Sequence, residues 1–205
     1  MKQEIDPKDT NRAIAFELWT KSPMPMVTIT KTFDVTRLRK VSRRRGMKFN
    51  MLLCWCIGRA ASRIEEFYML PQNDKLYKYD RMAVNVIVNN IKGGLSFCDV
   101  AVSDDLETFN DNYLRLTETI CQTCQDILDE EAVIIGTSAV TGTELDCIVN
   151  QYSGIFNNPF LSWARYRKGW FRTTLPISFQ FHHAQMDGCQ AARFLEELQK
   201  IINRL

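Results

Sequence analysis

Histidine, glycine, proline and long apolar runs are scarce in this 205-residue chain. It contains 2 His, 9 Gly and 6 Pro, which leaves little room for disordered linkers. The longest apolar run, MLLCWCIG at 51–58, is far shorter than the roughly 20 residues that cross a bilayer. Residues 1–12 mix both charge signs without an apolar stretch, so neither a secretory signal nor a transit peptide is expected. These features predict a single cytoplasmic domain over residues 1–205.

An excess of one charge is also absent. The chain has 26 Lys and Arg against 24 Asp and Glu, so its formal net charge is +2 and attracts no polyanion at long range. The segment RLRKVSRRRGMK, from Arg37 to Lys48, nevertheless holds seven cations. Such a run is typical of a solvated helix face. The alternatives are a site for cofactor phosphates or a nucleic-acid surface, which here lacks interleaved aromatic residues. We expect neither nucleic acid nor a membrane among the partners.

The cysteine count is odd, and most of the thiols lie in apolar stretches, which is typical of reduced, buried cysteines. Cys121 and Cys124 form a CxxC pair, but their neighbours follow a helical pattern and no second Cys or His pair stands at zinc spacing. We therefore expect no disulfide and no metal. The seven are Cys54, Cys56, Cys98, Cys121, Cys124, Cys147 and Cys189.

Hydrophobic periodicity predicts helices interleaved with strands. The expected fold class is α/β (α+β), a two-layer sandwich in which helices pack on a mixed, mainly antiparallel sheet. Three segments, 75–79, 81–90 and 94–102, are expected to form consecutive antiparallel strands, and 160–166 and 172–182 a hairpin. Further strands are expected at 26–33, 132–139 and 145–149. Helices are expected from caps at Asp9 and Thr10 to Trp19, over 34–45, 49–67 and 105–131, and at the end, with Ala191, Leu195, Leu198, Ile202 and Leu205 on one face.

Both histidines stand together in FHHAQMDG, residues 181–188. The odd positions of the preceding strand are apolar, and continuing this alternation puts His183 on the apolar side. Desolvation there would keep the imidazole neutral near pH 7, the state that a general base requires. The turn that follows lets the side chain face a cleft at the strand end. Two plainer interpretations are a satisfied core histidine and an ordinary Asp-Gly turn at Asp187.

The segment HHAQMDG resembles the HHxxxDG motif of the chloramphenicol acetyltransferase family and of the wider group of acyl-CoA-dependent acyltransferases. Condensation domains and dihydrolipoyl acyltransferases carry related patterns but are larger or contain additional modules, so the length of this chain favours the first family. NRAIAFELW, MKFNM, LDCIV and FLSWARY are similar to other segments of that family. The resemblance therefore spans nearly the whole chain.

This resemblance implies an acetyl-CoA-dependent O-acetyltransferase acting on chloramphenicol or a similar small molecule, and thus a role in antibiotic resistance. His183 would deprotonate the acceptor hydroxyl for direct attack on the thioester, while Arg12 and Asp187 would form a buried ion pair that holds the motif turn. The family assembles as a homotrimer with active sites between subunits, and the same is implied here. The residues that would contact acetyl-CoA are Lys48, Ser162, Arg165 and Tyr166.

The chain departs from the family at two places. Cys147 stands where the family has a serine that hydrogen-bonds the reacting centre, and a thiol is a weak donor. The acceptor region is poorer in Phe and Tyr than the family, and its substrate contacts are expected from Phe16, Trp19, Met24 and Met26. The alternatives are an acyltransferase for a different acceptor and a catalytically weakened homologue that binds a small apolar ligand.

Overall fold

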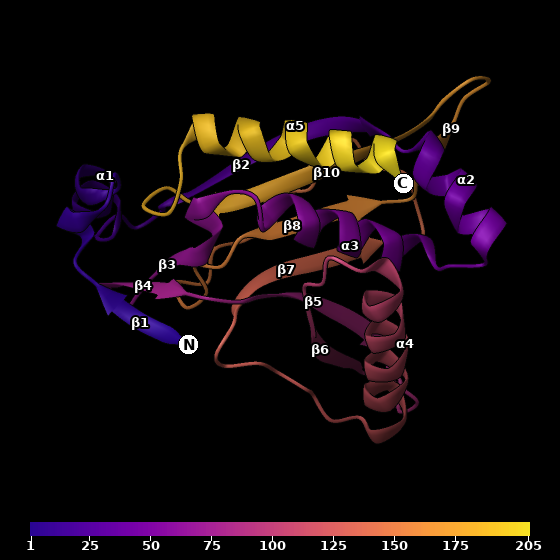
Figure 1. Ribbon diagram of the computed structural model, residues 1–205, viewed down its shortest axis with the longest axis horizontal. Helices are drawn as coiled ribbons and strands as arrows, with labels where there is room; N and C mark the ends of the chain where they lie inside the picture. Colours follow the sequence, from indigo (N-terminus) through magenta and orange to yellow (C-terminus); the bar gives the residue numbers. More distant parts are fainter.

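The computed structural model describes all residues, 1–205, as a layer of helices over a seven-stranded mixed sheet, with a separate three-stranded sheet beside it (Figure 1). The large sheet has the order β2-β10-β8-β7-β5-β6, and β9 pairs with β10. β7 runs parallel to β5 and β8, and the other pairs are antiparallel. The expected mixed, mainly antiparallel sheet is thus confirmed. Its strands are β2 (Met26–Asp34), β5 (Met82–Asn89), β6 (Leu95–Ala101), β7 (Val133–Val140), β8 (Phe160–Ala164), β9 (Arg167–Lys168) and β10 (Thr173–His182).

Helices cover one face of this sheet, where α3, α4 and α5 lie in front of the strands in Figure 1. The core between the layers is aromatic at its centre. Phe179 of β10 packs on Phe67 and on Phe194 of α5, with ring centroids 5.8 and 4.7 Å apart. Such rings contribute both buried area and specific edge or face contacts. The helices are α1 (Ala13–Trp19), α2 (Thr36–Arg45), α3 (Phe49–Ala61), α4 (Leu106–Thr123) and α5 (Gly188–Arg204), with 3₁₀ turns η1 (Pro7–Asp9) and η2 (Glu65–Tyr68).

Two helices are shorter than the periodicity predicts. α3 ends at Ala61, and a 3₁₀ turn replaces its expected last part. α4 ends where Cys124 adopts a left-handed conformation, with φ 57°. Beyond it, Ile127 does not continue the buried stripe of the helix, because its N–H and C=O bond Phe97 and Asp99 of β6. The unpaired backbone groups of this strand edge compete with helix propagation.

Other expectations are wrong for similar tertiary reasons. β4 (Lys75–Tyr79) does not join β5 and β6 but lies between β1 (Lys2–Ile5) and β3 (Met69–Gln72) in the small sheet. Residues 145–149 form no strand, since the N–H of Ile148 bonds the Ser178 hydroxyl at 2.9 Å instead of a neighbouring strand. α1 begins at Ala13 rather than after Thr10. Of the seven cysteines only Cys54, Cys56 and Cys98 are buried.

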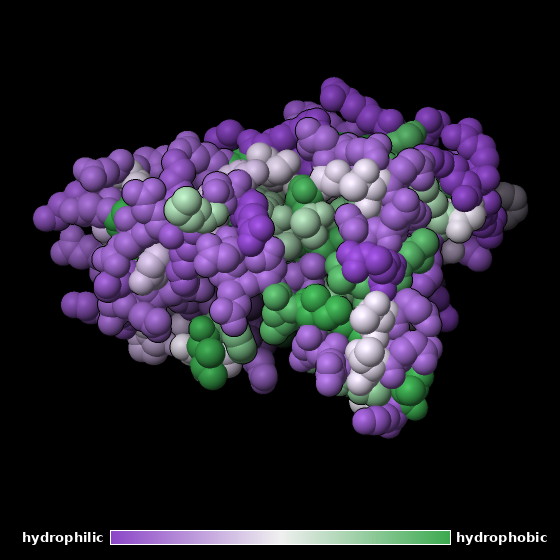
Figure 2. Space-filling model, turned by 60° about the horizontal axis from the view of Figure 1, so that its bottom comes forward, coloured by the Kyte–Doolittle hydropathy of each residue, from purple (hydrophilic) through white to green (hydrophobic).

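The surface is mostly hydrophilic but interrupted by apolar groups, one of which lies near the centre of the face shown in Figure 2. None of the helices has the length and apolar character needed to span a bilayer. Large apolar side chains are exposed on the loop between β7 and β8 and at the tip of the β9–β10 hairpin. They are Val149, Ile155, Phe156, Trp170 and Phe171.

The close approach of β7 and β8 requires a glycine at position 136. A Cβ built on Gly136 would lie 2.2 Å from Cδ2 of the Phe160 ring, its register partner. Gly136→Ala must therefore displace this ring, and we expect the free energy of unfolding to fall by about 1–3 kcal/mol. Urea unfolding of Gly136→Ala, alone and combined with Phe160→Ala, measures this. The cost should largely disappear in the Phe160→Ala background, and an equal cost in both backgrounds would contradict the steric explanation.

Candidate functional site

The end of β10 places both histidines at the rim of the sheet. β10 pairs with β2 as far as His182, which lies opposite Met26, and the N–H of His183 bonds the carbonyl of Pro25 at 2.8 Å. The chain then turns through 183–185 and enters α5. His183 thus belongs to the turn rather than to the strand.

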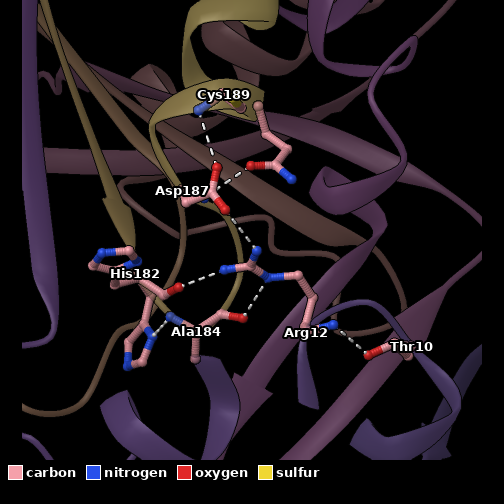
Figure 3. Close-up of polar contacts among 8 residues, drawn as sticks. Thr10, Arg12, His182, Ala184, Asp187 and Cys189 are labelled. Atoms are coloured by element: carbon pink, nitrogen blue, oxygen red, sulfur yellow. Dashed lines mark hydrogen bonds and ion pairs between the residues drawn. The ribbon is translucent and has the colours of Figure 1, made fainter. Parts of the chain in front are cut away.

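The guanidinium of Arg12 anchors this turn. Its guanidinium donates to the carbonyls of His183 and Ala184, at 2.8 and 3.2 Å, and to the Asp187 carboxylate at 3.1 Å (Figure 3). The Arg12 side chain is only 4% exposed, whereas that of Asp187 is 41% exposed, so the pair is not fully buried as expected. One cation therefore satisfies three oxygens of a segment that leads directly into α5.

Asp187 also caps α5. Its carboxylate accepts from the N–H of Cys189 at 3.0 Å, and its own N–H donates to the Gln190 side chain at 3.1 Å. Partial burial raises the pKa of Asp187, but the hydrogen bonds from Cys189 and Arg12 outweigh this and leave the pKa below its ordinary value. The carboxylate is therefore charged at neutral pH and joins helix start, turn and Arg12 into one unit.

The imidazole of His183 is half-buried and lies flat against the indole of Trp19. The ring centroids are 4.6 Å apart and the planes differ by 5°. Nδ1 is buried without a hydrogen-bond partner, whereas Nε2 makes no hydrogen bond and is not buried. This arrangement fixes the ring plane and leaves Nε2 open to a proton donor.

His182, not His183, is the desolvated histidine. It is 1% exposed, and its Nδ1 accepts from the N–H of Ala184 at 3.1 Å. Burial, with a smaller contribution from neighbouring His183, lowers the pKa of His182 to about 4. The prediction that His183 is desolvated is wrong. The alternation of side chains along β10 ends at His182, and the turn rotates His183 out of the sheet.

The residues expected at the cofactor gather near the opposite end of β10, with one exception. Tyr166 packs on Phe49 with ring centroids 5.0 Å apart, and exposed Lys48 directly precedes Phe49 at the start of α3. Arg165 is exposed beside Tyr166 and has no ion-pair partner, like Lys48. Ser162, by contrast, is buried and donates to Asn150 at 2.9 Å, so it faces no open site.

Arg39 of α2 completes this group and was not singled out from the sequence. Its guanidinium carbon lies 6.0 Å from the centroid of the Tyr166 ring, and its Nε is buried without a partner. The sequence does not distinguish Arg39 from the other cations of the run 37–48. Its periodicity indicates only that Arg39 lies near the buried positions Leu38 and Val41. Lys48, Arg165 and Arg39 around one aromatic ring can bind phosphates and an adenine.

A groove of about 740 Å³ crosses the sheet face turned away from the helices. It begins at Met26, the register partner of His182, and ends at Asp99 of β6. Asp99 accepts from Asn85 at 2.7 Å and from the N–H of Asp129 at 2.8 Å, and burial raises the pKa of this carboxyl. Of the expected acceptor contacts Phe16, Trp19, Met24 and Met26, only Met26 lines the groove.

The groove residues were missed because they occupy the polar positions of alternating strands. Asn85, Asp99 and Gln180 alternate with core residues, and such positions are usually solvent-facing. Here they surround a hollow instead. Their signal in the sequence is that Asn85 and Asp99 occupy strand positions, where Asn and Asp are depleted.

Cys147 does not approach His183 within one chain. It is exposed, and the adjacent Ile148 is bonded to Ser178, five residues before His183 on β10. That separation corresponds to about 16 Å along an extended strand. The two side chains can share a site only if they come from different copies of the chain.

The depressed pKa of His182 makes stability depend on pH. The unfolded chain binds a proton near the ordinary pKa of histidine and the folded chain only near 4, so stability is retained above about pH 6.5 and lost as the pH falls. We expect this group alone to lower the free energy of unfolding by on the order of 3 kcal/mol between pH 7 and pH 4.

His182→Asn is the matched variant, since an Asn carbonyl can accept from the Ala184 N–H without titrating. Urea unfolding from pH 7 to pH 4 should give a flatter stability profile for this variant than for the native chain. Parallel profiles would show that His182 does not titrate as its burial implies.

Comparisons with solved structures agree with the fold. A solved chloramphenicol acetyltransferase superposes with a TM-score of 0.83 at 20% identity, covering 98% of this chain and 100% of the other. A dihydrolipoamide acetyltransferase of Azotobacter vinelandii superposes with a TM-score of 0.60 at 19% identity, covering 98% and 90%. Both likenesses concern the fold.

Sequence comparisons identify the family as well as the fold. Chloramphenicol acetyltransferase 3 of Escherichia coli is 26% identical over 208 residues, which span 98% of this chain and 96% of that protein. A chloramphenicol acetyltransferase of Clostridium perfringens is 27% identical over 209 residues, spanning 96% and 93%. The sequence profile described as chloramphenicol acetyltransferase matches residues 2–199. The chain therefore belongs to the chloramphenicol acetyltransferase family, a family of acyltransferases.

Proposed function

We propose that this chain is an acetyl-CoA-dependent O-acetyltransferase in which Nε2 of His183 removes the proton from the hydroxyl of a small acceptor. The observation that carries this proposal is an unbonded, accessible Nε2 on a ring fixed by Trp19 and by the turn that Arg12 holds. Family membership supports acyl transfer as the chemistry. A cytoplasmic location and a role in antibiotic resistance are part of the same proposal.

The reaction is a direct transfer. As the acceptor oxygen attacks the thioester carbonyl, its proton passes to Nε2, and a tetrahedral intermediate forms. Collapse of this intermediate breaks the carbon–sulfur bond, and the imidazolium returns the proton to the departing coenzyme A thiolate. A positioned base of this kind supplies roughly 10²–10⁴-fold in rate.

Trp19 supports this step physically. With Nε2 as acceptor, the neutral ring carries its proton on Nδ1, which is shielded from water. When Nε2 takes the second proton, the imidazolium lies on the face of the indole, 4.6 Å away between centroids. A cation over an indole face is stabilised by the ring quadrupole. Trp19 is thus a positioning residue for the base as well as an expected substrate contact, together with Phe16, Met24 and Met26.

Acetyl-CoA supplies the acyl group, and the end of β10 opposite the histidines fits its nucleotide part. Lys48 and Arg165 are exposed cations without carboxylate partners, Arg39 has an unpaired Nε, and Tyr166 offers a half-exposed ring. We assign phosphate contacts to the cations and adenine stacking to the tyrosine. Ser162 is buried and contributes only through its bond to Asn150.

A homotrimer with active sites between subunits accounts for the position of Cys147. Within one chain it is separated from His183 by about 16 Å of strand, but it lies on a loop rich in exposed apolar residues. Val149 and Phe156 are 74% and 69% exposed, and Phe156 lines the groove. A neighbouring copy that covered this loop would bury both and could bring its His183 to the groove.

The alternatives keep the fold but change the ligand. The surface that lines the groove is mainly apolar, with Asn85, Asp99 and Gln180 among its hydrogen-bonding side chains, which favours an apolar acceptor that carries a few polar groups. A homologue that binds a small apolar ligand without turnover is the second candidate, because Cys147 is a poor donor to an oxyanion. Calorimetry separates the two: acceptor binding without coenzyme A binding would favour the second.

A thiol-release assay with acetyl-CoA and a panel of hydroxylated acceptors, chloramphenicol among them, tests the proposal. His183→Ala should lower kcat about 10²–10⁴-fold, with little change in acetyl-CoA binding, because it removes only the base. Cys189→Ser, which changes an exposed side chain at the start of α5, is the matched control. No acceptor-dependent thiol release by the native chain, or full activity of His183→Ala, would refute the mechanism.

Cys147→Ser replaces a weak donor by a good one. A lost donor to a developing oxyanion costs about 10²–10³-fold in kcat, so we expect a gain of up to that size with chloramphenicol. Steady-state kinetics of this variant, with Cys189→Ser as control for a general cysteine effect, gives the answer. An unchanged kcat would mean that Cys147 does not face the reacting carbonyl and that the acceptor is another compound.

A further inference from the structure

Two aromatic side chains project from the tip of the β9–β10 hairpin into solvent. Trp170 is 99% exposed and Phe171 is 93% exposed. The N–H of Gly169 bonds the carbonyl of Arg172 at 2.8 Å, so these two residues form the whole connecting loop. Hairpin loops of this length usually carry Asn, Asp or Gly. Large aromatic residues at such a tip touch nothing in their own chain and increase the exposed apolar surface.

The hairpin stands beside the basic helix α2. Thr173 at its base donates to the Thr36 hydroxyl and accepts from the N–H of Val35, both at 2.8 Å. Figure 1 shows the hairpin and α2 at the same end of the molecule, at the start of β10 and far from the histidines at its other end. The aromatic tip and the cationic helix therefore form one surface.

The cations of this surface are largely free. Lys40, Arg43 and Arg44 of α2 and Lys168 of β9 are exposed and pair with no carboxylate. Arg172 is 78% exposed and lies 3.8 Å from Asp34. Glu144 and Asp146 both pair with Arg167, so these three groups together carry one negative charge, against four unpaired cations on this surface.

We propose that this surface docks on an anionic lipid bilayer, with Trp170 and Phe171 entering the interfacial region and the cations facing lipid phosphates. Tryptophan is enriched at the boundary between headgroups and acyl chains, and clustered Lys and Arg are attracted to anionic leaflets. Stable peripheral binding generally needs two such signals together. A bilayer is favoured over a protein partner because the apolar tip stands beside unpaired cations of α2 and β9, which match the phosphates of an anionic lipid surface.

This proposal revises the expectation that no membrane is a partner. That expectation rested on the absence of a spanning segment and on the net charge of +2. Interfacial docking needs neither a long apolar run nor a high net charge, because it depends on the local arrangement of a few side chains. The expectation that nothing spans a bilayer is unaffected.

Co-sedimentation of the full chain with vesicles tests the docking. We expect binding to vesicles of phosphatidylcholine mixed with phosphatidylglycerol, weakening as salt increases, and little binding to phosphatidylcholine alone. The double variant Trp170→Ser, Phe171→Ser should bind at least about tenfold more weakly, since burial of even one of these side chains contributes roughly that factor. Lys40→Gln, Arg43→Gln, Arg44→Gln should bind more weakly and with less dependence on salt. Ile91→Ser, which removes an exposed apolar residue elsewhere, is the matched control.

Several results would overturn the proposal. One is the absence of binding to anionic vesicles at low salt, and another is equal binding by the aromatic double variant with an unchanged thermal unfolding midpoint. A changed oligomeric state of that variant in sedimentation would assign the tip to a contact between copies. Salt-dependent binding of single-stranded DNA that is lost in the same variant would assign the surface to nucleic acid. None of these measurements uses acetyl-CoA, so their outcome is independent of the proposed acetyl transfer.

Discussion

The site depends on one buried cation. Burying the Arg12 guanidinium at 4% exposure is costly unless hydrogen-bond partners replace water, and the turn after β10 supplies three oxygens at 2.8–3.2 Å. The same contacts satisfy two carbonyls that would otherwise be left without donors where the strand ends. Arg12 is distant in sequence from residues 183–187, so the bonds also tie the N-terminal segment, and with it Trp19, to the histidine turn. The stacking of Trp19 on His183 follows from this connection.

The two faces of the large sheet differ because successive side chains along each strand point to opposite faces. Phe179 and Phe181 point toward the helices, while Ser178 and Gln180 contact the 146–150 segment on the opposite face through Ile148 and the carbonyl of Asn150. That segment covers the second face only in part, and the groove is the uncovered remainder. A sheet with one face completed by helices and the other left partly open is suited to binding a ligand or a neighbouring copy there. It also explains why polar side chains at strand positions line a hollow instead of meeting bulk water.

Sequence patterns predicted the elements whose ends are set locally and failed where distant contacts set them. α2 ends at Gly46, with φ 67°, where glycine was expected to end it. α4 stops early because the edge of β6 binds the backbone of Ile127, a long-range contact that periodicity cannot reveal. The motif located the histidine turn, yet alternation assigned desolvation to His183 instead of His182, since a turn changes the direction of side chains within one residue. Cys147 could be aligned with the family but not placed, because its neighbour Ile148 is held by Ser178 through an irregular loop.

β10 connects these features along its length. One end carries the histidines, and the other meets Tyr166, Arg39 and the aromatic hairpin tip. The cations at that end divide by burial: Arg39 lies beside the Tyr166 ring, whereas Lys40, Arg43 and Arg44 face solvent. Lys40, Arg43 and Arg44 lie three or four positions apart and share the exposed side of α2, whereas the half-buried Arg39 is turned toward the Tyr166 ring. The cationic run thus supplies two surfaces, an inner one for the phosphates of a cofactor and an outer one for an extended anionic partner.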